Sequence, residues 1–160
     1  VVNLEEGSYM EMETAQIKGV DSTYRKTEAK LAARSKLIIH EKIMTHGKQA
    51  AVTDFKVDLD GEDCGAHVIA RSVATEYSHQ KYISRVNGNN RCNGQTECDA
   101  IIMDKASVEA IPEIAANDTD ASLIHEAAIG KIAGEQLTKL MTLGLTEKEA
   151  EEEIINGFLK

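Results

Sequence analysis

Three cysteines and one histidine are the residues with the most distinctive chemistry in this chain. Cys64, Cys92 and Cys98 can supply thiolates and His125 an imidazole, so together they offer ligands for soft metals. Cys98 follows a polar turn at residues 93–97 and precedes an apolar run, which predicts a partly exposed thiol at the entrance of a strand. The alternative is a small buried hydrophobic residue, the commoner role of an isolated cysteine.

The spacing of these residues matches no common zinc site. Cys92 and Cys98 are six residues apart, unlike the ligand pairs of a zinc ribbon. Cys64 and His67 lie three residues apart after a turn and could hold a metal together, although such a pair also arises by chance. We expect the remaining histidines, which lie in polar sequence, to be surface residues: His40, His46 and His79.

Signatures of the common enzyme classes are absent. The chain has no G-x-x-x-x-G-K-[ST] phosphate loop, no dinucleotide fingerprint and no G-x-S-x-G nucleophile turn. His125 and Glu126 lack the second histidine that a zinc-protease helix requires. We therefore predict no catalytic residues and a protein that is not an enzyme.

The composition indicates one globular domain. The chain has 160 residues, of which 42% are hydrophobic and only 4% aromatic, so its core must use small and branched side chains. The net charge of −9 argues against nucleic-acid binding. The sequence has no run of about 18 apolar residues, so it predicts no membrane-spanning helix. An odd number of cysteines favours a reducing cytoplasm. Because the chain begins at Val1 rather than Met, we expect a fragment.

Residues 8 to about 115 are predicted to form strands. In residues 53–60, apolar or Thr side chains alternate with Asp and Lys, the period of a half-buried strand. Similar runs follow at even spacing, 14 residues from Phe55 to Ile69 and 14 from Ile69 to Ile83. A sandwich, a barrel and a β-solenoid all fit this spacing. Small residues expected to face inward suit the narrow interior of a solenoid: Ala33, Ser35, Ala51, Ala70 and Ser84.

Residues 119–160 are predicted to form helices. Polar residues 117–120 offer N-cap oxygens before a first helix that would carry Leu123 to Ala128. A second helix is predicted at residues 135–143. A third begins with Thr146 and Glu149 in a capping box and ends near Gly157.

Residues 98–158 carry motifs that resemble the SufB/SufD family of iron–sulfur cluster assembly proteins. The motifs follow the family's order: residues 98–103 (CDAIIM), 111–114 (IPEI), 121–127 (ASLIHEA), 130–137 (GKIAGEQL), 140–150 (LMTLGLTEKEA) and 155–158 (INGF). The resemblance implies a mainly β protein, with a right-handed parallel β-helix at residues 1–116 and a small helical region at residues 117–160, both truncated.

The resemblance also implies a function. Family members form a scaffold on which transient iron–sulfur clusters are built, together with the ABC-type ATPase SufC and a sulfur donor protein. They pair with themselves or with a SufB/SufD-type partner. Carried over by motif, Cys98 is the candidate cluster ligand or sulfur-accepting thiol, His125 an imidazole ligand at the dimer interface, and Glu126 a carboxylate ligand. The helices at residues 135–157 would carry much of the ATPase-docking surface.

Some positions depart from the family pattern. Ile124 stands where SufB-like members often have Glu, whereas the retained Cys98 is more SufB-like. Lys139 and Leu143 replace an aromatic residue and an arginine of many members. A cluster scaffold and a non-ligating SufD-like structural subunit therefore both stay open, and a β-helix enzyme acting on carbohydrate is a weaker third reading.

Overall fold

The computed structural model describes residues 1–17 and 19–160; residue 18, inside the region predicted as strands, lies outside the described part. In the described residues, ten strands are followed by two helices: β1 (Val2–Leu4), β2 (Tyr9–Gln16), β3 (Ser22–Leu31), β4 (Lys36–Thr45), β5 (Ala50–Leu59), β6 (Cys64–Ala74), β7 (His79–Gly88), β8 (Cys92–Ile102), β9 (Ser107–Ala116), β10 (Ala121–Gly130), α1 (Gly134–Thr142) and α2 (Glu147–Phe158).

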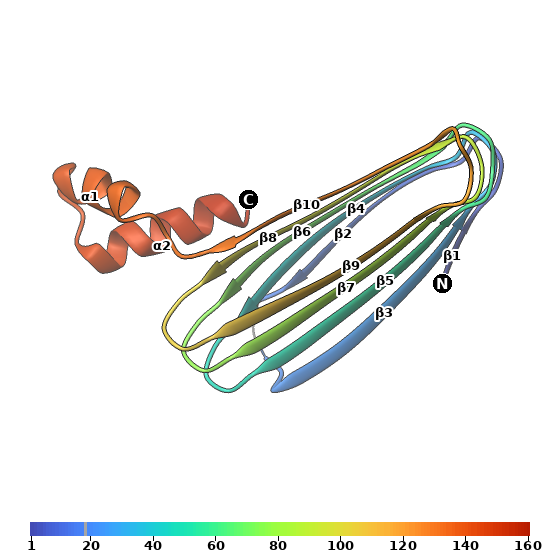
Figure 1. Cartoon of the computed structure of the whole chain (residues 1–160). Coiled ribbons are helices and arrows are strands. Elements are labelled where there is room, and N and C mark those ends of the chain that lie inside the picture. Colours follow the sequence, from blue (N-terminus) through green and yellow to red (C-terminus); the bar gives the residue numbers. More distant parts are fainter. Residues whose placement is uncertain (18) are drawn as a thin grey trace.

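The strands form two parallel sheets that face each other. One sheet has the order β1-β3-β5-β7-β9 and the other the order β10-β8-β6-β4-β2. The chain alternates between the sheets, so each coil contributes one strand to each, and Figure 1 shows the coils stacked as a flattened solenoid. This is the parallel β-helix that the resemblance implied. The 14-residue spacing of the apolar runs is half a coil, since Phe55 lies in β5 and Ile69 in β6.

The core fills the narrow space between the sheets. It is built from aliphatic and small side chains around Phe55, whose ring packs against Tyr82 at a centroid distance of 5.9 Å. Ser35, Ala51, Ala70 and Ser84 are buried as predicted. Ala33 lies instead in the turn between β3 and β4 and is only half-buried.

Residues 121–130 form a strand, not the helix predicted there. Leu123, Ile124, Ala127 and Ala128 have the spacing of a helix face, but β8 offers an open edge to which ten residues of β10 pair in register. Backbone pairing along a whole strand outweighs the local helical pattern. The change from strands to helices therefore comes after Gly130.

The two predicted C-terminal helices are confirmed. Thr146 caps α2, and the reciprocal hydrogen bonds between Thr146 and Glu149 form the predicted capping box. Gly157 lies within α2 rather than ending it, because the helix continues to Phe158. Neither described helix is long and apolar enough to cross a membrane. Figure 1 shows α1 beyond the end of β10, whereas α2 runs back toward the sheet, where Arg71 of β6 donates to the carbonyl of Phe158 at 3.5 Å.

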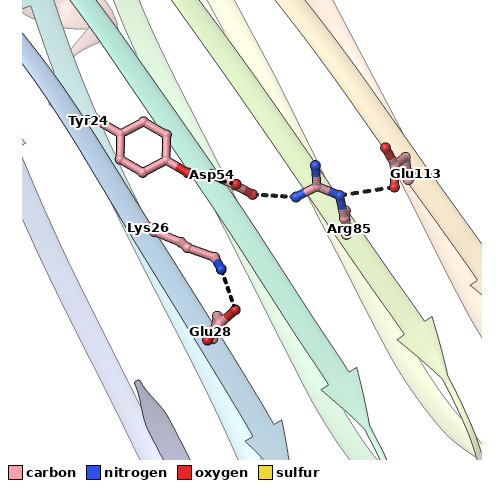
Figure 2. Close-up of polar contacts among 6 residues, drawn as sticks. All are labelled: Tyr24, Lys26, Glu28, Asp54, Arg85 and Glu113. Atoms are coloured by element: carbon pink, nitrogen blue, oxygen red, sulfur yellow. Dashed lines mark hydrogen bonds and ion pairs between the residues drawn. The ribbon is translucent and has the colours of Figure 1, made fainter.

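Polar ladders cross the coils on the outside of the solenoid. On the β1–β9 sheet, Arg85 binds Asp54 at 2.6 Å and Glu113 at 3.1 Å, and Tyr24 donates its hydroxyl to Asp54 at 3.1 Å (Figure 2). Lys26 and Glu28 pair on the same face at 2.6 Å. These contacts join β3, β5, β7 and β9, so they tie four successive coils together.

Candidate functional site

Cys98 lies inside the solenoid. It occupies the middle of β8, where its register neighbours are Ala70 of β6 and Ala127 of β10, and its residue is 3% exposed. The predicted partly exposed thiol is therefore wrong, because the alternation of β8 turns residue 98 inward. Burial, assisted by the carboxylate of Asp99, raises the pKa of Cys98 to about 11. The resting side chain is thus a neutral thiol.

His125 also faces the interior, from the middle of β10. Its Nδ1 lies 2.6 Å from the hydroxyl of Thr96, the residue directly opposite it on β8. Its Nε2 is buried and has no hydrogen-bond partner among the described residues. Burial lowers the pKa of His125, so the imidazole is neutral at pH 7.

Glu126 points to the opposite side of the sheet. As the neighbour of His125 in a strand, it is exposed on the outer face, in register with Glu97 of β8. The Oε1 atom of Glu97 lies 2.8 Å from the Nε2 atom of His67. Cys98 and His125 therefore share the interior, whereas Glu126 lies outside it. In the described part of the chain, no three His, Cys, Asp or Glu residues come together as a metal site.

A small cavity, lined mainly by apolar atoms, borders Cys98. It has a volume of about 20 Å³, enough for one water molecule, and its lining includes Glu41, Tyr82 and Thr53. Glu41 is only 1% exposed and forms an ion pair with Arg25 across the interior. The hydroxyl of Tyr82 is buried without a partner among the described residues.

The charged pair of this interior was not predicted from the sequence, although the sequence contains a signal for it. Its signal is Glu41 at an inward position of the alternating run Leu37, Ile39, Glu41, Ile43. A charge placed on the apolar face of a strand requires a buried partner, and Arg25 occupies the matching inward position of β3.

The other two cysteines lie away from this cavity. Cys64 and Cys92 are in register at the starts of β6 and β8, both buried, and all three cysteines are free thiols. Burial raises the pKa of Cys64 to about 11. Cys64 and His67 do not form a metal pair, because residues three apart in a strand face opposite sides, so their spacing in the sequence is accidental.

The surface prediction for the remaining histidines largely holds. His79 is exposed and contacts the Ser107 hydroxyl at 2.8 Å. His40 and His46 are half-buried. His40 lies 3.8 Å from Glu11 on the outer face of the sheet.

Comparison with known proteins extends the motif resemblance to almost the whole chain. The family model described as "SUF system FeS cluster assembly, SufBD core domain" matches residues 1–158. A SufBD family protein of Methanothermobacter thermautotrophicus is 34% identical over 120 residues, which are 71% of this chain and 28% of the relative. One from Pyrococcus horikoshii is 31% identical over 143 residues, 85% of this chain and 44% of the relative.

A bacterial relative gives the same indication. The iron–sulfur cluster assembly protein SufB of Bacillus subtilis is 33% identical over 97 residues, 58% of this chain and 21% of its own length. The matched part is less than half the length of each of these relatives. Since the core-domain model covers the solenoid and both helices, the chain belongs to the SufBD family of iron–sulfur cluster assembly proteins.

Proposed function

We propose that this chain is the core of a scaffold subunit on which nascent iron–sulfur clusters are built for transfer. The observation that carries the proposal is the match of the SufBD core domain to residues 1–158, on a solenoid that holds a thiol and an imidazole in one interior. The scaffold would work in a reducing compartment such as the cytoplasm, consistent with three free thiols.

In this proposal, Cys98 carries sulfur or contacts the growing cluster. Thiolate is the protein ligand that iron–sulfur clusters prefer, and Cys98 is offset from His125 by only two residues in register, whereas Cys64 and Cys92 lie at the starts of their strands. A neutral thiol with a pKa of about 11 must lose its proton before it acts. A partner or a structural change therefore has to lower the pKa of Cys98. Glu126 could join only a site formed on the outer face.

We further propose that the helix pair docks an ABC-type ATPase of the SufC kind. Leu143 is 75% exposed and Met141 45%, so α1 and the turn after it present apolar side chains to solvent. Apolar side chains exposed in this way are suited to a protein interface. A second SufB/SufD-type subunit, or a second copy of this chain, would complete the scaffold, and a sulfur donor protein would supply sulfur.

The alternative function is that of a non-ligating, SufD-like structural subunit. Two observations favour it. Cys98 is buried as a neutral thiol, and Glu126 lies on the other side of the sheet from Cys98 and His125. Such a subunit would shape the complex and couple ATP-driven motion without holding metal.

Anaerobic native mass spectrometry of the whole protein, co-expressed with its ABC-type ATPase, tests both functions. The scaffold function predicts a complex with added iron and sulfide mass, which Cys98→Ala removes and the matched variants Cys64→Ala and Cys92→Ala retain. The same complex without iron or sulfide supports the structural subunit. Absence of any complex contradicts both partner proposals.

A further inference from the structure

The contact between Thr96 and His125 bears on which ring nitrogen carries the proton. The Thr96 hydroxyl and His125 Nδ1 are 2.6 Å apart, within hydrogen-bond distance. The hydroxyl of Thr96, which is 2% exposed, has no other hydrogen bond among the described residues. A buried hydroxyl hydrogen needs an acceptor, and Nδ1 is the acceptor present.

We propose that Thr96 holds His125 in its Nε2–H tautomer, so that His125 presents a hydrogen-bond donor to the interior rather than a metal-binding lone pair. A neutral imidazole has one N–H, and a nitrogen that accepts from a hydroxyl leaves the proton on the other. Thr96 is then a positioning residue, because it acts through His125.

Under this assignment the buried Nε2 carries the proton. It is enclosed and has no partner in the described part of the chain, so its N–H is a donor without an acceptor in the single chain. Cys98 lies two residues beyond Thr96 on the same inward face of β8. A sulfur anion held at Cys98 is an acceptor of the right chemistry. That identification of the acceptor rests on the proposed function, whereas the tautomer does not.

Nitrogen NMR of the whole protein, labelled with ¹⁵N at its five histidines, tests the tautomer directly. Two-bond ¹H–¹⁵N correlations distinguish Nδ1–H from Nε2–H rings, and His125→Gln assigns the signals by their loss. The wild-type His125 is expected to give the Nε2–H pattern alone. Thr96→Val, which removes the hydroxyl and keeps the shape, should lose that pattern in favour of a mixture of tautomers.

Two further variants serve as controls. Thr96→Ser retains the hydroxyl and should retain the Nε2–H pattern. Thr53→Val changes another buried threonine of the interior and should leave His125 unaltered. A Nδ1–H pattern in the wild type, or an unchanged pattern in a folded Thr96→Val, would overturn the proposal. If Thr96→Val does not fold, the wild-type spectrum alone still shows which tautomer His125 adopts. Neither the wild-type nor the variant spectrum depends on whether the protein binds iron.

Discussion

Cys98 and His125 lie on neighbouring strands with their side chains on the same inward face, offset by two residues in register. Strand spacing and rise put their Cα atoms about 8 Å apart. The cavity beside Cys98 is also lined by Tyr82 and by Glu41, which pairs with Arg25. Burial favours the neutral forms of Cys98 and His125, because it penalises charge.

The protonated state of Cys98 makes stability depend on pH. Its pKa is raised from 9.0 to about 11 in the folded chain, so its contribution is complete below pH 9 and is lost as the pH rises through 11. The loss is at most roughly 2–3 kcal/mol. We expect the difference in unfolding free energy between wild type and Cys98→Ala to narrow by that amount between pH 8 and 11.

Urea unfolding under reducing conditions at several pH values measures this difference. Other groups that titrate in the alkaline range are the same in both proteins, so their contributions cancel, except for Tyr82, whose pKa is raised mainly by burial and partly by Cys98. If the unfolding free energies of wild type and Cys98→Ala differ by the same amount at every pH in this range, the pKa of Cys98 is not raised in the folded chain.

At the scale of single elements, the outer ladder of Figure 2 depends on Arg85. It binds Asp54, which is 6% exposed, and removing the guanidinium leaves that carboxylate with Tyr24 as its hydrogen-bond donor. We expect Arg85→Met to cost about 1–3 kcal/mol of unfolding free energy. The control is Lys148→Met in α2. Lys148 and Glu152 form an exposed ion pair at 3.9 Å, which should contribute little to the unfolding free energy. Equal effects of the two variants on thermal unfolding would argue against the ladder.

The turns of successive coils pack closely, which leads to a second prediction at the scale of single elements. A Cβ added at Gly61 would lie 2.0 Å from the backbone nitrogen of Ala33 in the preceding coil, and backbone cannot move aside as a flexible side chain can. Gly61→Ala should therefore destabilise the chain by about 3 kcal/mol or more. Gly134→Ala, at the first residue of α1 with no atom within 4 Å, should be neutral or stabilise by up to about 1 kcal/mol. Chemical denaturation of both variants compares them.

The success of sequence-based prediction also differs between elements. The period of residues 53–60 and the inward small residues were predictable, because alternation and side-chain size act locally. The capping box of Thr146 was predictable for the same reason. The strand at β10 was not, because its local spacing fits a helix and only the open edge of β8 selects a strand. That error put His125 on a helix, and the face of every site residue depends on such assignments.

At the scale of the whole molecule, the stack of coils has two ends. Central strands such as β6 are hydrogen-bonded to a neighbour on each side, and their inward residues are buried along their full length. The end strands β1, β2, β9 and β10 each pair on one side within their sheet, and the last residues of β10 are exposed. Pro112 fits this arrangement, since it lies in the end strand β9, where a missing N–H is tolerated.

A stack with open ends should lose its structure from the ends inward. Backbone amides of β4 to β8 can exchange only when several coils separate, whereas opening an end coil breaks one set of strand contacts. We expect hydrogen exchange followed by mass spectrometry to show slow exchange in β4 to β8 and faster exchange in β1, β2, β9 and β10. Measurements at two protein concentrations provide the control, because association through an open edge would protect β9 and β10 only at the higher concentration. Uniform protection at both concentrations would contradict independent opening of the ends, and would mean that the stack unfolds as one cooperative unit.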